Sequence, residues 1–362
     1  MRPRSSLITK IAFIVAVGIG LSLWRAADLP AAPVRREQLR PPQLVRLRGH
    51  ALISAPARSI AVGAAGDIAC EGPPDQVDLD RCRYDDTADL LTGLAGVLVL
   101  GDGQYESGEL ESFRRYYQPT WGKYIARTYP APGNHEYTQD PRSTPTGYFR
   151  YFGDRVRGPD GLGYYSVDLP TGCTPGVGVC WHLIALSSEL CFASGGCGPA
   201  TDPNDPGPGN RMHAWLEHDL RTHPGDEYPC TLAFWHHPLF SISDGSASTP
   251  GTRPLWKLLY QAHADVVLNG HSHNYQRWLP QDPFGTRDPR RGIREFVVGT
   301  GGASKYGLLP GSGSTNLATS QNQAFGILRM SLHPAGYVWR WVSAAGQPSG
   351  FTDTATSVAA CV

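Results

Sequence analysis

The segment Gly96-Val97-Leu98-Val99-Leu100-Gly101-Asp102-Gly103-Gln104-Tyr105 indicates both the fold and the site of this protein. The apolar run at its start is typical of a strand buried on both faces. The glycines on either side of Asp102 allow a sharp turn and a close approach of the backbone to a ligand. Ligands of open α/β sheets bind outside the carboxyl ends of the strands. The segment therefore predicts an acid, and a phenol three residues later, at a binding site.

The same pattern of a short apolar strand followed by an Asp, Asn or His loop occurs five times in the chain. A helix expected over 85–92 joins the strands 60–65 and 96–100, which makes them a parallel pair and brings their acids to one edge. The five strands and the polar residues that follow them are 60–65 with Asp67, 96–100 with Asp102, 128–131 with Asn134, 231–235 with His236, and 265–268 with His271 and His273.

The remaining patterns complete an α/β chain with no internal repeat. Alternation predicts strands over 164–169, 181–186 and 295–298, and a closing hairpin formed by 325–332 and 337–342. Helical stretches are expected over 109–127 with an interruption at Pro119, over 211–221 and over 255–262, and residues 148–152 are expected to form a short aromatic turn in the core.

Seven of the polar side chains form a plausible ligand set for two metal ions. A mixture of nitrogen and oxygen donors without thiolate suits zinc, iron or manganese. One carboxylate can bridge two ions roughly 3.5–4 Å apart. The predicted ligands are Asp67, Asp102, Tyr105, Asn134, His236, His271 and His273.

These motifs together resemble those of the calcineurin-like metallophosphoesterases and, within them, the purple acid phosphatases. The resemblance covers about residues 59 to 345. It implies a four-layer α/β/β/α sandwich of two mixed sheets, with the metals where the loops of both sheets meet. The segments that carry it are 66–67, 101–105, 133–136, 236–238 and 270–275.

One departure from the wider family points to the purple acid phosphatases. Many metallophosphoesterases have a histidine ligand two residues after the first aspartate, where this chain has Ala69. Tyr105 fills that gap, as the matching tyrosine does in purple acid phosphatases. The resemblance assigns Asp67, Tyr105 and His273 to Fe(III), and it assigns Asn134, His236 and His271 to a divalent iron, zinc or manganese ion. Asp102 would bridge the two ions.

The resemblance also implies a reaction, the hydrolysis of phosphomonoesters by a metal-activated hydroxide. His135 would protonate the leaving group. His237 and Tyr275 are expected to contact the phosphate or to hold ligands, and Glu136 to orient its loop. Two alternatives stay open: a phosphodiesterase or nucleotide hydrolase with the same site, and an exported surface protein whose metal site is structural.

The amino-terminal region predicts export. Basic residues precede an apolar stretch at 11–24, so residues 1–29 form a signal peptide or an uncleaved membrane anchor. Residues 30–58 are rich in Pro and Arg and are predicted to be a linker, and 59–362 a single catalytic domain. Residues 1–60 hold ten Lys/Arg and two Asp/Glu, which leaves 22 basic against 30 acidic residues in the remainder. An acidic domain argues against nucleic-acid binding, and a small phosphorylated substrate is expected, with the oligomeric state open.

Eight cysteines agree with an oxidising compartment, where an even number favours disulfides. No C-x-x-C is present, which argues against a zinc cluster. Proximity in the sequence favours the pairs Cys70–Cys82, Cys173–Cys180 and Cys191–Cys197, and it leaves Cys230 with Cys361.

Overall fold

A computed structural model gives the structure over residues 59–73, 81–138, 146–193, 195–309, 315–348 and 350–362. The predicted signal peptide or anchor (1–29), with its apolar stretch at 11–24, and the predicted linker (30–58) lie outside these residues. Within the described part of the chain, no helix has the length and apolar character needed to cross a membrane.

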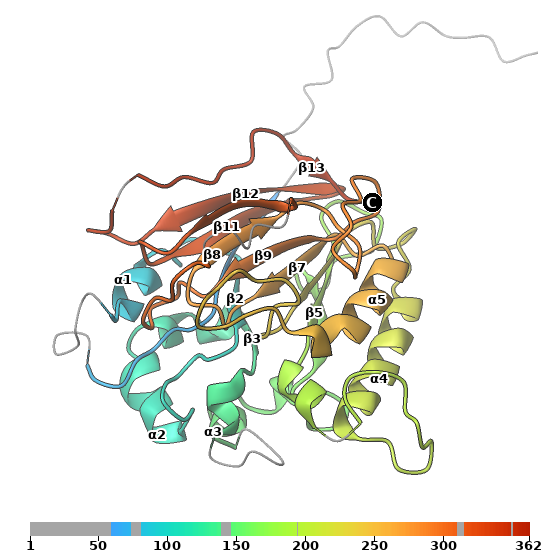
Figure 1. The fold of residues 1–362 in the computed structure, drawn as a ribbon, viewed down its shortest axis with the longest axis horizontal. Helices are drawn as coiled ribbons and strands as arrows, with labels where there is room; N and C mark the ends of the chain where they lie inside the picture. Colours follow the sequence, from blue (N-terminus) through green and yellow to red (C-terminus); the bar gives the residue numbers. More distant parts are fainter. Residues whose placement is uncertain (1–58, 74–80, 139–145, 194, 310–314, 349) are drawn as a thin grey trace, which may run out of the picture. The chain divides into compact units, whose positions relative to one another are not determined.

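The first sheet has six strands and is mixed (Figure 1). Its β1–β2 and β2–β3 pairs are parallel, as the β-α-β pattern predicts, and β11 pairs antiparallel with both β1 and β12. In spatial order the strands are β13 (Ala359–Ala360), β12 (Gly336–Ser343), β11 (Gly326–His333), β1 (Ile60–Ala65), β2 (Gly96–Leu100) and β3 (Thr128–Ala131).

The second sheet has seven strands, of which β5, β6, β7 and β9 run parallel. The sequence patterns did not predict β8 and β10, because Tyr275-Gln-Arg-Trp is short and Leu317-Ala-Thr-Ser-Gln is largely polar. In spatial order the strands are β10 (Leu317–Gln321), β8 (Tyr275–Trp278), β9 (Arg294–Val298), β7 (Val266–Asn269), β6 (Thr231–Phe234), β5 (Trp181–Ala185) and β4 (Tyr165–Leu169).

The helices fall into two groups on different sides of the strands (Figure 1). The expected aromatic turn at 148–152 is part of a helix, since Tyr148, Phe149 and Phe152 recur at helical spacing and are buried. The helices are α1 (Tyr84–Asp89), α2 (Leu110–Ser112), α3 (Thr146–Phe152), α4 (Pro208–Thr222) and α5 (Arg253–Gln261). Shorter segments are a π turn at Phe113–Tyr117 and 3₁₀ turns at Trp121–Arg127, Asn134–Tyr137, Asp154–Val156, Ser188–Phe192 and Pro250–Thr252.

Two clusters of buried apolar residues fill the spaces between the four layers. Leu183, Leu232 and Leu268 of the second sheet face the first sheet, in a core that also holds residues of α1 and α3. Their neighbours Ile184 and Ala233 face the other way and pack with residues of α4 and α5. Alternate residues of one strand thus enter different cores, as the pleat requires. This arrangement confirms the four-layer α/β/β/α architecture with two mixed sheets.

The carboxyl ends of the two sets of parallel strands meet. The N–H of Gly66, just after β1, donates to the carbonyl of Val298 at the end of β9, at 2.9 Å. The N–H of Gly301 returns a bond of 3.0 Å to the carbonyl of Gly66. Loops that follow strands of different sheets are therefore joined by backbone hydrogen bonds, and their side chains can converge.

All four predicted disulfides are confirmed: Cys70–Cys82, Cys173–Cys180, Cys191–Cys197 and Cys230–Cys361. The last joins residues 131 apart and links the residue after β13 to the residue before β6. Next to it, the buried carboxylate of Asp265 accepts the N–H groups of Thr231 and Val362. This pair therefore closes the longest covalent loop among the four.

Replacing Cys230 and Cys361 by serine should destabilise the protein by about 5 kcal/mol, because the cross-link removes loop entropy from the unfolded chain. The same replacement of Cys173 and Cys180, which are 7 residues apart, should cost about 2.4 kcal/mol. Urea unfolding of the two double variants measures both losses. A larger loss for the Cys173–Cys180 pair would contradict the assignment of the long loop as the main covalent stabiliser.

Candidate metal centre

The structure brings all seven predicted ligands to one place. Tyr105 stands at the centre of one half of the cluster. Its Oη lies 2.9 Å from Asp67 Oδ1 and 2.9 Å from His273 Nε2. It also lies 3.0 Å from Asp102 Oδ2. These residues follow β1, β2 and β7, so loops of both sheets form this half.

The other half contains His236, Asn134 and His271. His236 Nε2 lies 3.0 Å from Asn134 Oδ1 and 3.1 Å from Asp102 Oδ2. The ring of His271 lies 4.9 Å from that of His236, between centroids, and its backbone N–H donates to Asp67 Oδ2 at 2.8 Å. Asp102 Oδ2 thus contacts both halves, which is the position a bridging carboxylate needs.

Strained backbone marks the same residues. Asp67, Asp102 and His271 have φ angles of 59°, 48° and 65°. Residues other than glycine rarely adopt positive φ angles, and backbone strain of this kind is common at functional sites. In the described part of the chain the only further such residue is His263. The loops are therefore held in an unfavourable conformation that aims these side chains into the cluster.

Two glycines make the close packing of the cluster possible. A Cβ on Gly101, whose φ is 84°, would lie 2.5 Å from His236 Nδ1. A Cβ on Gly133 would lie 2.3 Å from Asp102 Oδ1. Glycine is needed at both positions because any side chain would displace a predicted ligand.

The donors fit bound cations. His236 Nδ1 donates to the carbonyl of Leu100 at 2.8 Å, and His273 Nδ1 donates to that of Ser304 at 2.5 Å. In the neutral imidazoles, each Nε2 then carries a lone pair that faces oxygen atoms about 3 Å away. Lone pairs facing one another require a cation between them, either a proton or a metal ion.

Burial makes a counter-charge necessary. Asp67 and Asp102 are 0% and 1% exposed. Among the described residues their carboxylates form ion pairs with histidines alone. Burial lowers the pKa of His236, but the charge and hydrogen bond of the Asp102 carboxylate raise it by more, so that the pKa is about 10. Burial opposes ionisation of Asp102 as well, yet His236 and His135 lower its pKa.

Tyr105 supports the same conclusion. Burial and the charges of Asp102 and Asp67 raise the pKa of Tyr105 well above its ordinary value. A phenolate therefore forms there only if a cation compensates it. At His271, burial and the nearby His236 lower the pKa to about 4, so its ring is neutral and able to ligate.

His135 lies at the mouth of the cluster. Its Nδ1 donates to the carbonyl of Glu106 at 2.6 Å, and its ring packs on that of Tyr105 with centroids 4.2 Å apart. Nε2 is left facing Asp102 Oδ2 at 3.9 Å. This orientation places a titratable nitrogen between the cluster and the adjoining cavity.

Glu136 bonds backbone groups of two loops. Its carboxylate accepts the backbone N–H groups of Gly133 at 2.7 Å, Asp102 at 3.0 Å and Gln104 at 3.3 Å. Burial and the charge of Asp102 raise its pKa to about 8. The N–H donors favour the charged form and oppose part of this rise, and they tie the loop after β3 to the loop after β2.

His237 and Tyr275 have different placements. His237 adjoins the cluster, with its ring centroid 4.1 Å from that of His271. The Tyr275 side chain instead lies in the core, where its hydroxyl donates to Asp353 at 2.6 Å. This contradicts the expected role of Tyr275 at the site. The tyrosine opens β8, and the pleat of the strand turns its ring to the core.

A cavity of about 430 Å³ opens beside the Tyr105 half of the cluster. Several residues near the cluster were not predicted from the sequence. The ring of Tyr306 stacks on that of His273 at 3.9 Å, Arg81 lines the cavity wall, and Glu189 lies 3.4 Å from His237 Nε2. Burial raises the pKa of Glu189 to about 7. The glycine-rich turn Gly299-Thr300-Gly301-Gly302, just before Tyr306 in the sequence, is a signal that could have pointed to it, whereas no sequence motif marks Arg81 or Glu189.

Comparison with known proteins gives a family match over more than half of the chain. The model of the family described as calcineurin-like phosphoesterase matches residues 61–275. A probable inactive purple acid phosphatase 1 of Arabidopsis thaliana is 23% identical over 276 residues, which are 67% of this chain and 41% of that protein. Probable purple acid phosphatase 20 of the same plant is 26% identical over 196 residues. The match covers 48% of this chain and 40% of that protein. The chain spans about two fifths of the length of these relatives.

Solved structures show the same fold. The purple acid phosphatase PPD1 from yellow lupin (Lupinus luteus) seeds has a TM-score of 0.63 at 17% identity, covering 82% of this chain and 54% of that chain. GAP50, described as the anchor in the inner membrane complex of Plasmodium, has a TM-score of 0.56 at 12% identity, covering 82% and 88%. These likenesses confirm the fold expected from the resemblance.

Replacing Glu136 by Gln should destabilise the protein by about 1–3 kcal/mol, because an amide NH₂ would face a backbone N–H donor in a buried position. The matched control is Glu106→Gln, whose carboxylate is 72% exposed and whose replacement should change stability little. Urea unfolding measures both. Equal, small effects would show that Glu136 does not hold the loops.

Proposed function

The chain belongs to the calcineurin-like phosphoesterase family, and we propose that it is a dinuclear-metal phosphomonoesterase similar to the purple acid phosphatases. The observation that carries the proposal is the convergence of seven nitrogen and oxygen donors, two of which are buried carboxylates. One relative is named as probably inactive, so this chain's own donors, rather than the likeness, support the activity.

The arrangement suggests one ion in each half of the cluster. Asp67, Tyr105 and His273 would hold Fe(III), for which an anionic phenolate oxygen is a suitable hard donor. A divalent iron, zinc or manganese ion would be held by three further donors. These are Asn134, His236 and His271, with Asp102 shared between the ions. When bound, such a pair polarises a phosphate ester and lowers the pKa of water.

His135 is suited to protonate the leaving group. The hydrogen bond from its Nδ1 to the carbonyl of Glu106 fixes the ring, so in the protonated imidazolium Nε2 carries the proton that can be transferred to the leaving group. That nitrogen points to the cluster, and the ring also lines the cavity. A small phosphorylated substrate whose phosphate contacts the ions would place its ester oxygen within reach of this side chain.

We also infer that the protein works outside the cytosol. Four disulfides are typical of exported proteins. The amino-terminal segment 1–29 is predicted to direct export, either as a cleaved signal or as a tether through residues 11–24. The acidic balance of the chain beyond residue 60 supports a small-molecule substrate rather than a nucleic-acid partner.

Replacing Asp102 by Asn should remove the hydrolysis of an aryl phosphate while the protein still folds. The bridging charge contributes several kcal/mol to the stabilisation of the transition state, so kcat/KM should fall by roughly 10³-fold or more. Asp154→Asn is the control, since that carboxylate is 98% exposed and outside the site. Normal turnover by the folded Asp102→Asn variant would refute the proposed function.

Replacing His135 by Ala should have an effect that depends on the leaving group. For an alkyl phosphate, whose alkoxide needs a proton, kcat should fall by about 10²–10⁴-fold. For p-nitrophenyl phosphate, whose phenolate leaves without a proton, kcat should change much less. Steady-state rates on both substrates measure this difference. An equal loss on both would mean that His135 positions the phosphate rather than donates a proton.

A further inference from the structure

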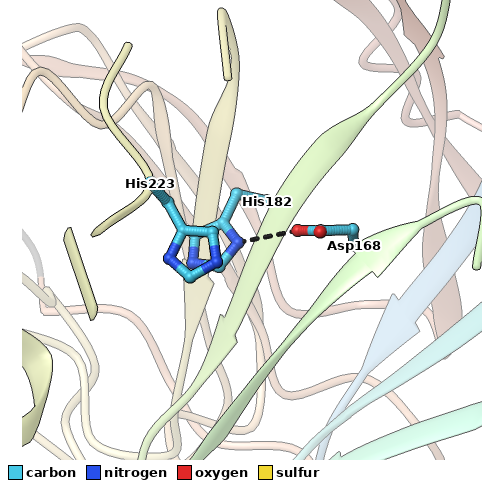
Figure 2. A group of neighbouring side chains, drawn as sticks. All are labelled: Asp168, His182 and His223. Carbon is cyan, nitrogen blue, oxygen red and sulfur yellow. Dashed lines mark hydrogen bonds and ion pairs between the residues drawn. The ribbon is translucent and has the colours of Figure 1, made fainter. Parts of the chain in front are cut away.

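A buried histidine far from the candidate metal centre bonds two carboxylates. His182 is the second residue of β5, and its side chain is 1% exposed. Its Nδ1 lies 2.9 Å from Oδ1 of Asp168, which stands opposite it on β4, as Figure 2 shows. Its Nε2 lies 2.8 Å from Oδ2 of Asp219 on α4. One imidazole ring therefore joins the edge of the second sheet to the helix that covers it.

Every oxygen of the two carboxylates accepts a hydrogen bond. The hydroxyl of Tyr228 donates to Asp168 Oδ2 at 3.2 Å, and the hydroxyl of Ser166 donates to Asp219 Oδ1 at 2.8 Å. The two remaining oxygens face the nitrogens of His182. Only an ionised carboxyl group accepts through both oxygens without donating. The hydrogen bond from His182 lowers the pKa of Asp168, which agrees with the ionised form.

Two acceptors require two donors from the ring between them. A neutral imidazole has one N–H, so its other nitrogen would direct a lone pair at the second carboxylate, whereas an imidazolium ion donates from both nitrogens. Burial lowers the pKa of His182, but the hydrogen bonds and charges of Asp168 and Asp219 raise it by more, so that the pKa lies above its ordinary value. The geometry and the charges therefore both favour the doubly protonated ring.

The other groups around the ring leave His182 as the main counter-charge. His223, just after α4, stacks on His182 with ring centroids 3.9 Å apart, and its Nδ1 donates to the backbone carbonyl of Asp219 at 2.8 Å (Figure 2). The ring of Tyr228 lies 5.5 Å from that of His182, and the partner of His182 on β6 is the uncharged Thr231. Among the described residues, histidines alone form ion pairs with the two carboxylates.

We propose that His182 is held as an imidazolium ion between Asp168 and Asp219, and that this clamp ties α4 to the edge of the second sheet and weakens as the pH rises. A histidine whose pKa is raised by folding stabilises the folded state fully below its ordinary pKa, about 6.5. The contribution is lost as the pH rises through the raised value. The ring then has one N–H left, and one of the two carboxylates loses its donor.

The test is urea unfolding of the full-length wild type and of His182→Gln, which keeps a donor but never gains a proton, between about pH 5.5 and about pH 9. The folding equilibrium constant of the wild type, divided by that of the variant, should fall by up to about tenfold per pH unit above about pH 6.5. His218→Gln, at an exposed position of α4 outside the clamp, is the matched control and should follow the wild type at every pH. A ratio for His182→Gln that does not change with pH would overturn the proposal.

If His182→Gln does not fold, the ring ¹⁵N chemical shifts of the wild type decide. At about pH 7 an ordinary histidine is about one quarter charged, whereas both ring nitrogens of His182 should be mostly protonated. Asp168→Asn, which keeps an acceptor oxygen but removes one negative charge, should move the loss of the proton from His182 to lower pH. A mainly neutral His182 ring in the wild type at about pH 7 would overturn the proposal.

Discussion

The structure depends on the burial of two carboxylates that have no Lys or Arg partner among the described residues. Asp67 and Asp102 lie almost without exposure where the loops of the two sheets meet. A buried, uncompensated charge costs several kcal/mol. These two residues and the nearby His271 also adopt positive φ angles that oppose folding. Such an arrangement is stable only with cations, and the histidines around it have lone pairs directed to receive them. The folded structure and the proposed reaction therefore both require cations beside these two carboxylates.

Much of the fold could be predicted because buried parallel strands are continuous apolar runs that end in turn residues. The segment around Asp102 contains both signals, as does the stretch before His236. Three of the disulfides followed from proximity, since short loops close most easily, and the fourth joins the two cysteines that were left. β8 and β10 have neither a continuous apolar run nor a turn residue that marks their end. Their place in the sheet depends on the pairing of β8 with β9 and of β10 with β8. Tyr275 shows the limit of motif reasoning, because its neighbour His273 enters the site while its own side chain packs in the core.

The residues that sequence reasoning missed have a common cause. Tyr306 contacts His273 across 33 positions, and Glu189 contacts His237 across 48, with no local pattern linking them.

The most direct test of the central claim is the metal content per chain of the wild-type protein and of the Asp67→Asn, Asp102→Asn double variant, measured together with the visible spectrum. The account predicts that the folded double variant holds two ions fewer, one of them iron. It also predicts that the wild type has a phenolate-to-iron absorption band, which Tyr105→Phe lacks. A double variant with as many ions as the wild type, or a wild type that stays colourless after oxidation, would contradict it.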